Sequence, residues 1–264
     1  MKKILKKILN NNTKFYAFAS YLYNWNKMHW QPLKYGDLNK LLIIYTTLND
    51  KVNFIQVGSN DGVSNDPLFE FANKKNWAGY CIEPIPLNFQ KLKNNYSHTP
   101  EIKLLNLAIG EDGYLTMYYI DPIKAKFFNI DLPEWYNQLA SFNRDLVVSD
   151  INGINRYQIL ESINVKAISF NTSIEKYNIS KVDLLHIDTE GADWSILSSF
   201  PFIKLMPDVI IFEHNHISLN DYKKAVHFLR KEGYLLLKVN TDTFAAKNIF
   251  LNAYKNELEK ACKY

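Results

Sequence analysis

Short apolar runs alternate with segments of helical spacing from about residue 53 onward, which predicts strands and helices in turn. The first strands are expected at 53–57, 77–83 and 102–109, with helices at 65–75 and 86–96 between them. A strand–helix–strand rhythm joins neighbouring strands in parallel through right-handed crossovers. We therefore expect a parallel sheet with helices on both faces.

The same rhythm returns in the second half of the chain. Strands are expected at 164–170, 182–188 and 208–214, with helical segments after each of them. The last two apolar runs, 234–239 and 243–251, are separated by a short polar break and predict an antiparallel hairpin. The sequence thus predicts an α/β fold with a central, mostly parallel seven-stranded sheet whose last strand is reversed.

Residues 121–162 interrupt this rhythm with an aromatic, polar and irregular stretch. Residues 113–120, just before it, alternate in polarity and either extend the sheet or form a hairpin. A long insert in a compact domain is usually a lid or a binding loop, and a surface subdomain without a ligand is the alternative. We expect a helical N-terminal extension over 1–49 and one main domain over 50–264 that carries this insert.

Composition narrows the class of protein. The 264 residues, 47% hydrophobic and 22% charged, suit one large soluble α/β domain. A net charge of +4 is too balanced to indicate a nucleic-acid partner. Cys81 and Cys262 form no CxxC pair, which fits a reducing compartment. No stretch is long and apolar enough to span a bilayer, and the basic start lacks the apolar core of a signal peptide, so we expect a cytoplasmic protein.

The first predicted strand runs into the loop QVGSNDG, in which Gly58 and Gly62 flank three polar residues. Glycines at a strand-to-helix turn let the backbone approach a ligand closely. The spacing is GxxxG, not the GxGxxG of dinucleotide-binding proteins, and Asp61 would repel a phosphate at a helix N-terminus. The loop therefore suits a cationic or zwitterionic ligand better than a pyrophosphate.

The next two predicted strands end in polar residues that suit a nucleoside. Glu83 ends the second strand, 21 residues after Gly62. In wound sheets an acid at this place accepts hydrogen bonds from ribose hydroxyls, and a surface or capping glutamate is the alternative. Asn106 opens NLAIG at the end of the third strand, where an adenine edge would lie.

Several motifs, in order, resemble one family. FIQVGSNDG, YCIEP, LNLAIG, LASF, VDLLHIDTEGADW and DVIIFEHN follow one another as in FkbM-type S-adenosylmethionine-dependent O-methyltransferases, over about residues 50–250. This resemblance implies the Rossmann-like class I methyltransferase fold and S-adenosylmethionine as cofactor. Many class I enzymes carry an acid at the Gln56 position and a glycine at the Asn60 position, so the loop contacts differ here. The cofactor-binding residues expected are Gln56, Gly58, Asn60, Asp61, Gly62, Glu83, Asn106 and Ala108.

Carboxylates and histidines follow two neighbouring buried strands, 182–188 and 208–214. Ligands bind in open α/β sheets at the carboxyl ends of strands. Several acids at adjacent strand ends are costly to keep together without partners, which favours a functional role. The catalytic residues expected in this crevice are Asp188, Glu190, Glu213, His214 and His216.

Methyl transfer to a hydroxyl needs in-line alignment, which is worth up to ~10 kcal/mol, and help with removing the hydroxyl proton. A histidine base can take that proton, and His214 and His216 are the candidates. Alternatively, a divalent metal held by oxygen ligands can acidify the hydroxyl. Asp188, Glu213 and His214 are placed like the ligands of metal-dependent O-methyltransferases, so Mg²⁺ or Mn²⁺ is the other expectation.

The function expected is O-methylation of a sugar hydroxyl, with a nucleotide-linked sugar as the partner, in the biosynthesis of a surface polysaccharide or glycan. A nicotinamide-dependent oxidoreductase is an alternative, against which the GxxxG loop counts, and a non-catalytic cofactor-binding domain is another. The sequence leaves open whether the protein forms a homodimer, and it does not determine which sugar or which hydroxyl is methylated. Insert residues expected to cover the substrate are Trp135, Tyr136, Gln138, Ser141 and Arg144.

Overall fold

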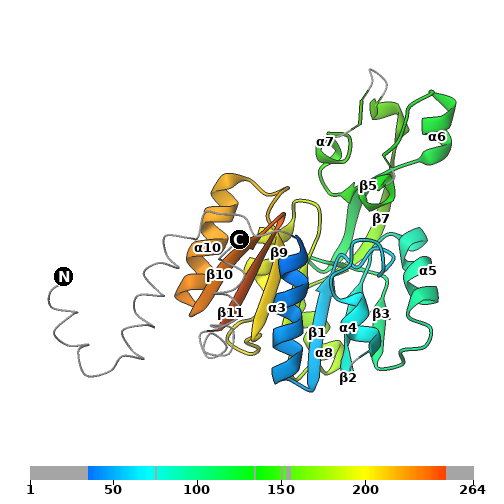
Figure 1. Cartoon of the computed structure of the whole chain (residues 1–264). Coiled ribbons are helices and arrows are strands. Elements are labelled where there is room, and N and C mark those ends of the chain that lie inside the picture. Colours follow the sequence, from blue (N-terminus) through cyan, green and yellow to red (C-terminus); the bar gives the residue numbers. More distant parts are fainter. Residues whose placement is uncertain (1–34, 75, 134, 150, 153–155, 248–264) are drawn as a thin grey trace, which may run out of the picture.

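A computed structural model describes residues 35–74, 76–133, 135–149, 151–152 and 156–247 of the chain (Figure 1). Residues 1–34 of the expected N-terminal extension and the expected strand end after residue 247 lie outside this part. Within it, no helix is both long and apolar enough to cross a membrane.

Seven strands form the main sheet, in the order β10-β11-β9-β8-β1-β2-β3. Neighbouring strands pair in parallel except β11, which runs antiparallel to both β10 and β9. This confirms the predicted mostly parallel sheet with a reversed last strand. Its strands are β1 (Lys51–Val57), β2 (Asn76–Ile82), β3 (Ile102–Leu105), β8 (Leu184–Ile187), β9 (Val209–Glu213), β10 (Tyr234–Val239) and β11 (Asp242–Lys247).

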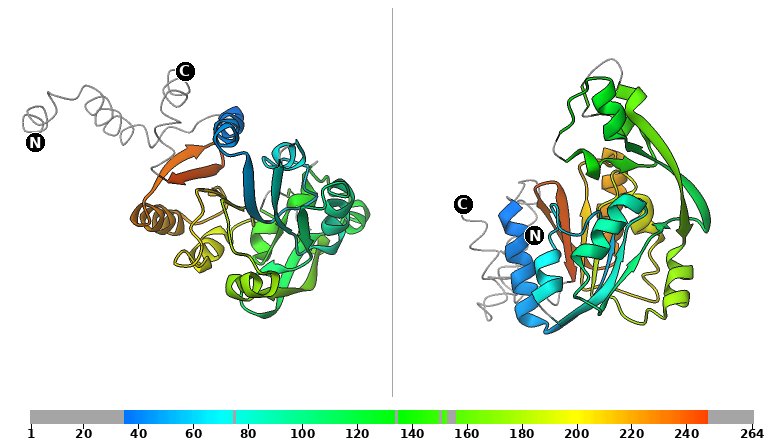
Figure 2. Two further views of the ribbon diagram at one scale, coloured as in Figure 1. Left: turned by 90° about the horizontal axis from the view of Figure 1, so that it is seen from below. Right: turned by 90° about the vertical axis from the view of Figure 1, so that its right-hand side faces the viewer.

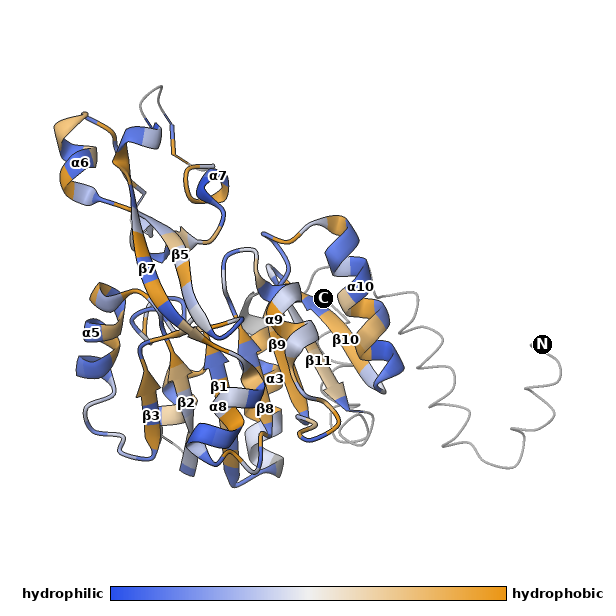
Figure 3. Cartoon of the chain, turned by 180° about the vertical axis from the view of Figure 1, so that it is seen from behind, coloured by the Kyte–Doolittle hydropathy of each residue, from blue (hydrophilic) through white to orange (hydrophobic). Residues whose placement is uncertain are grey.

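Helices cover both faces of the main sheet (Figures 1 and 2). Successive strand residues point to opposite faces, so Phe54 of β1 packs into one apolar cluster and Ile55 into the other. Figure 3 shows the apolar residues concentrated on these strands. One face carries α3 (Tyr35–Leu48), α4 (Phe69–Lys74) and α5 (Pro86–Asn95), and the other α8 (Phe170–Tyr177), α9 (Asp193–Ser199) and α10 (Leu219–Lys231).

The described part of the expected N-terminal extension packs into this core. Leu42 and Tyr45 of α3 are fully buried beside strands of the main sheet. The domain boundaries themselves stay a prediction.

A second, four-stranded sheet stands over the carboxyl ends of the main strands, in the order β4-β7-β5-β6 (Figure 2). It corrects two predicted strands. The run 102–109 divides, because only 102–105 pairs with β2 and 108–109 pairs with β7. Of the run 164–170, residues 164–168 belong to β7, which pairs antiparallel with β5 instead of joining the main sheet, and Phe170 begins α8. These strands are β4 (Ala108–Ile109), β5 (Gly113–Ile120), β6 (Ala140–Ser141) and β7 (Leu160–Ile168).

The insert between β5 and β7 has a small apolar core of its own. Buried side chains such as Ile120, Leu139 and Ile159 pack together there. They come from several short elements, so no single period in the sequence indicated them. Besides β6, these elements are α6 (Pro122–Phe127), η1 (Tyr136–Gln138), α7 (Arg144–Val147) and η2 (Arg156–Ile159).

Candidate active site

A pocket of about 830 Å³, counting the part open to solvent, lies at the carboxyl ends of β1, β2 and β8. The loops after these strands form its walls. Met117 and Ala140 of the second sheet form its roof, together with Phe142, which directly follows β6. This is the edge at which open α/β sheets bind their ligands. Of the predicted cofactor residues, the pocket is lined by Gln56, Gly58, Asn60, Glu83 and Ala108.

Three predicted cofactor residues lie outside the pocket lining and have structural contacts instead. The Asp61 carboxylate accepts hydrogen bonds from the Ser64 amide and hydroxyl, and so shapes the loop. A Cβ at Gly62 would lie 2.5 Å from side-chain atoms of α5, so this glycine permits close packing. The Asn106 amide donates to the carbonyls of Glu83 and Pro84.

Glu83 is held in the pocket by two backbone amides. One carboxylate oxygen accepts from the Asn60 amide at 2.9 Å and the other from the Ile85 amide at 2.8 Å. Each oxygen keeps a further acceptor position for a ligand hydroxyl. Burial raises the pKa of Glu83 to about 7, although these two hydrogen bonds oppose the shift. The carboxyl is therefore oriented by the backbone and available to two neighbouring donors.

Asn60 offers further polar atoms to a ligand. Both its side-chain oxygen and its side-chain nitrogen are buried and have no hydrogen-bond partner among the described residues. Such orphaned atoms usually meet a water or a ligand group. Their position in the pocket lining fits a polar ligand lying across this loop.

Gly58 has a structural reason for being glycine, besides the close approach of a ligand that the sequence predicts. Its φ is +83°, and a Cβ there would lie 1.7 Å from the carbonyl oxygen of Asp188. The Asp188 amide also donates to the Val57 carbonyl at 2.9 Å. The glycine therefore lets the ends of β1 and β8 come into contact, independently of any ligand.

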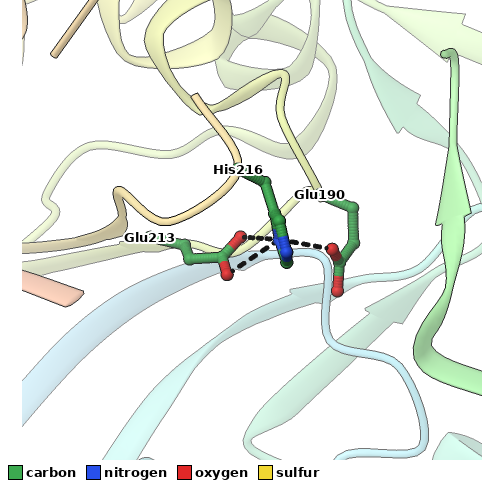
Figure 4. Close-up of side chains that lie close together, drawn as sticks. All are labelled: Glu190, Glu213 and His216. Carbon is green, nitrogen blue, oxygen red and sulfur yellow. Dashed lines mark hydrogen bonds and ion pairs between the residues drawn. The ribbon is translucent and has the colours of Figure 1, made fainter. Parts of the chain in front are cut away.

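Glu190, Glu213 and His216 form a compact cluster at the ends of β8 and β9 (Figure 4). His216 Nδ1 lies 2.7 Å from a Glu190 carboxylate oxygen and 3.0 Å from one of Glu213. These two carboxylates raise the pKa of His216 to about 11, against the effect of burial. With no other cation present, the imidazole would be protonated at neutral pH. The candidate ligand atoms of all three side chains lie within 4.8 Å of one another.

The insert holds the loop that carries Glu190. Glu190 has a φ of +52°, a left-handed conformation that a non-glycine residue rarely adopts. Its carbonyl accepts a hydrogen bond of 2.8 Å from the hydroxyl of Ser141, which lies on β6 and is buried. A Cβ at the neighbouring Gly191 would lie 2.9 Å from Leu146 of α7. The second sheet and α7 therefore contact the candidate catalytic loop directly.

His214 does not join this cluster. Its Nδ1 lies 3.1 Å from the Thr243 hydroxyl, and its ring lies 5.2 Å from that of Tyr222. Burial, helped by Lys238, lowers the pKa of His214 to about 4. Successive residues at an extended strand end point in opposite directions, so His214 diverges from Glu213. His216 returns to Glu213 because the chain bends after β9.

The expected metal trio of Asp188, Glu213 and His214 is therefore not the one that the structure brings together. Among the described residues, the structure instead brings together the candidate ligand atoms of Glu190, Glu213 and His216. Asp188 lines the pocket nearby. Burial, and then repulsion from Glu213 and other carboxylates, raises the pKa of Asp188.

The insert residues expected over the substrate fall in several places. Gln138 lines the pocket, and its side-chain oxygen accepts from Asn65 at 3.2 Å. Tyr136 lies on a neighbouring apolar cavity, while Ser141 contacts Glu190.

The other two predicted substrate residues lie outside the pocket lining. Trp135 is 40% exposed. The Arg144 guanidinium lies over the Tyr157 ring, 5.1 Å from its centroid. Among the described residues, neither Trp135 nor Arg144 lines the pocket.

Two further titratable side chains, Asp66 and His186, line the pocket. Asp66 lines the pocket and accepts a hydrogen bond from the Gln56 amide at 3.1 Å. His186 is buried in the lining, where burial lowers its pKa to about 4, so it is neutral. A signal for Asp66 was present in the sequence, since it ends the polar loop that begins at Gly58.

Fold and pocket together define the class of protein. A seven-stranded sheet whose last strand is inserted antiparallel between β9 and β10, with a pocket at the ends of β1, β2 and β8, is the class I methyltransferase architecture. The family described as Methyltransferase FkbM domain matches residues 56–236, which is more than half of the chain. The chain belongs to this family.

Solved structures similar to this chain include methyltransferase FkbM from Methylobacillus flagellatus KT, at 14% identity and a TM-score of 0.45, covering 74% of this chain and 44% of that one. Precorrin-6y C5,15-methyltransferase from Geobacter metallireducens GS-15 has 11% identity and a TM-score of 0.39, with coverage of 79% and 87%. Ribosomal protein L11 methylase from Lactobacillus delbrueckii subsp. bulgaricus has 11% identity and a TM-score of 0.39, with coverage of 80% and 77%. This chain thus spans less than half the length of the Methylobacillus protein. No curated protein matches the chain.

Proposed function

We propose that this chain is an S-adenosylmethionine-dependent O-methyltransferase that methylates a hydroxyl of a sugar, with a nucleotide-linked sugar as acceptor. One observation carries the proposal. A single pocket joins Glu83, an oriented acceptor for ribose hydroxyls, to Glu190, which belongs to the cluster with Glu213 and His216. Cofactor binding and activation of a hydroxyl need these two kinds of group side by side.

The cofactor half of the pocket fits a nucleoside with a charged tail. Glu83 would accept from the two ribose hydroxyls, and the orphaned side-chain atoms of Asn60 would bond the polar tail. Leu107 and Ile109 offer apolar walls for the base. Bound S-adenosylmethionine supplies an activated methyl group on a sulfonium.

The acceptor half must align a hydroxyl and remove its proton. Alignment alone is worth up to ~10 kcal/mol in such reactions. Because its two carboxylate partners would keep His216 protonated, a carboxylate is the better proton acceptor in a protein-only mechanism. Glu190 is then the candidate base, because it lines the pocket and Glu213 is not among the lining residues.

A metal-assisted version uses the same three side chains. Two carboxylate oxygens and one imidazole nitrogen within 4.8 Å of one another form a donor set that fits Mg²⁺ or, better, Mn²⁺. Glu190, Glu213 and His216 would hold the ion, which supplies the positive charge that lowers the pKa of a hydroxyl. His216 would then be neutral.

The neighbouring apolar cavity supports a nucleotide-linked acceptor. It has a volume of about 770 Å³, counting the part open to solvent, and shares Asn88 and Ala140 with the main pocket. Its lining includes Tyr119 and Tyr136, whose rings offer stacking surfaces, and Lys91, which offers a cation to a phosphate.

Incubation with isotopically labelled S-adenosylmethionine and a panel of free and nucleotide-linked sugars tests the proposal. We expect one methyl group to be added to a sugar hydroxyl, as read by mass spectrometry and located by NMR. A methyl group found on nitrogen or carbon, or no transfer to any sugar despite cofactor binding, would contradict O-methylation of a sugar.

Chelation separates the two versions of the mechanism. If a metal assists, treatment with EDTA abolishes turnover, Mn²⁺ or Mg²⁺ restores it, and calorimetry shows that cofactor binding survives. Metal binding should also release about one proton per ion from His216, because the ion takes its place. Full turnover in EDTA would rule out the metal and leave Glu190 as the base.

A further inference from the structure

Gln56 and Asp66 form a polar pair in the wall of the main pocket. Gln56 is the sixth residue of β1, and its amide nitrogen donates to an Asp66 carboxylate oxygen at 3.1 Å. The amide oxygen of Gln56 faces Cys81 Sγ at 3.8 Å, which turns its NH₂ group toward Asp66. The other oxygen of Asp66 accepts from the Leu68 amide at 2.7 Å. The carboxylate is thus held by neutral donors, the Gln56 side chain and backbone amides.

This carboxylate lacks a positive partner. Burial raises the pKa of Asp66 to about 6, and the groups that lower it are hydrogen bonds from backbone amides and Gln56, with no cation among the described residues. The other pocket carboxylates differ. Asp188 also has no cation among its described neighbours, but it lies with Glu190 and Glu213 at the acceptor end, where their charges repel its own. Glu83 is fixed for ribose hydroxyls by two backbone amides, and Glu190 is paired with His216. A half-buried carboxylate with neutral donors only is stabilised most by a cationic ligand group.

We infer that Asp66 binds the α-ammonium group of the methionine part of the cofactor, with Gln56 as the residue that positions it. This inference rests on the proposed function. The cofactor has two positive centres, and the sulfonium must face the acceptor hydroxyl on the Glu190 side. The ammonium group then points toward the pocket wall formed by residues 64–67, which includes Asp66. Because residue 56 is a glutamine, this position at the end of β1 carries no carboxylate. Asp66, from the loop that follows β1, places a carboxylate next to the Gln56 side chain.

The variant Asp66→Asn tests this assignment, because Asn keeps an oxygen for the Leu68 amide and loses the charge. Calorimetry would compare three ligands: S-adenosylmethionine, S-adenosylhomocysteine, and S-adenosylhomocysteine without its amino group. We expect the first two to bind roughly tenfold or more weakly to Asp66→Asn, while affinity for the deaminated ligand is unchanged within about twofold. The unliganded variant should unfold close to the temperature of the parent, since the lost hydrogen bond from Gln56 is offset by removal of a charge that burial penalises.

Asp112→Asn is the matched control. Asp112 also accepts from a backbone amide, of Ser169, and from a side-chain hydroxyl, of Thr172, but lies outside the pocket lining. It should leave all three affinities unchanged.

Four other results would overturn the assignment. An equal loss for all three ligands would mean that Asp66 only shapes the pocket. A loss for S-adenosylmethionine alone would assign Asp66 to the sulfonium. No loss for any ligand would remove Asp66 from the site, and a lower unfolding temperature with unchanged affinities would make its role structural. If the parent protein binds none of the three ligands, the proposed function itself fails.

Discussion

The two ends of the pocket are built in different ways. At one end the carboxylate of Glu83 is held by backbone amides of the loops that follow β1 and β2. At the other end Glu190, Glu213 and His216 hold one another by charge, and Ser141 supports Glu190 from the second sheet. The first end is thus fixed by the main sheet, whereas the second depends on ionisation states and on the insert.

This difference implies that binding and turnover can be separated. A backbone-fixed acceptor keeps its geometry when distant side chains change, because its donors belong to the main fold. A charge cluster changes when one partner loses its charge, because a buried ion without its partner is costly. Substitutions at the Glu83 end should therefore alter affinity for the cofactor, and those at the His216 end should alter the rate.

The largest effect is expected for Glu213→Gln. It removes one of the two charges that hold His216, so we expect the single-turnover rate at saturating cofactor to fall roughly 10²- to 10⁴-fold. Cofactor affinity, measured by calorimetry, should stay within about twofold of the parent value, since Glu213 does not line the pocket. Glu175→Gln on α8 is a matched control on an exposed surface. An unchanged rate for Glu213→Gln would remove the cluster from the chemistry.

The next largest effect is expected at the other end, for Glu83→Gln. Loss of a charge-assisted acceptor is worth about 1.5–3 kcal/mol, so cofactor affinity should fall roughly 10- to 150-fold, while the rate at saturation changes little. Calorimetry with S-adenosylhomocysteine and its 2′-deoxy analogue identifies the group concerned. The variant should lose most of the parent's preference for the ribose form. If both ligands weaken equally, Glu83 does not contact the ribose.

Cofactor affinity should also depend on pH through Glu83, whose pKa burial raises to about 7. Ribose hydroxyls donate to the ionised carboxyl, so affinity should fall roughly tenfold as the pH drops from 8 to 6. The unliganded fold behaves in the opposite way. For an acid with a raised folded-state pKa, the stabilising contribution is complete below the unfolded value of 4.5 and is lost as the pH rises through about 7. Calorimetry from pH 6 to 8 would measure the cofactor affinity of the parent and of Glu83→Gln. An affinity of the parent that does not change with pH would contradict the prediction.

The smallest effect is expected for Ser141→Ala, which tests how far the insert supports the charged end. The lost hydrogen bond to the Glu190 carbonyl is worth about 0.5–1.5 kcal/mol, so the maximal rate should fall roughly 2- to 10-fold with cofactor affinity unchanged. Ser149→Ala is the matched control, because its hydroxyl bonds a carbonyl within the insert, that of Leu146. Loss of cofactor affinity in place of rate would show that Ser141 supports the pocket as a whole.

Much of the main fold follows from the sequence alone. The alternation of apolar runs with helical spacing gave the parallel sheet, and the two apolar runs beyond residue 233 gave its reversed last strand. These features depend on the spacing of hydrophobic residues within short stretches of chain, which can be read directly from the sequence. The placement of Glu83 in a pocket at the end of the second strand could be predicted for the same reason.

The charged end could be predicted only as a set of candidates. The sequence placed five acids and histidines at two strand ends, and only the structure separated His216, which meets Glu190 and Glu213, from His214, which meets Thr243. Likewise, the second sheet, the support of Glu190 by Ser141 and the pairing of Gln56 with Asp66 appear only in the folded chain. Contacts such as that of Ser141 with Glu190 join residues 49 positions apart, and the packing of two sheets brings them together, which no local period encodes.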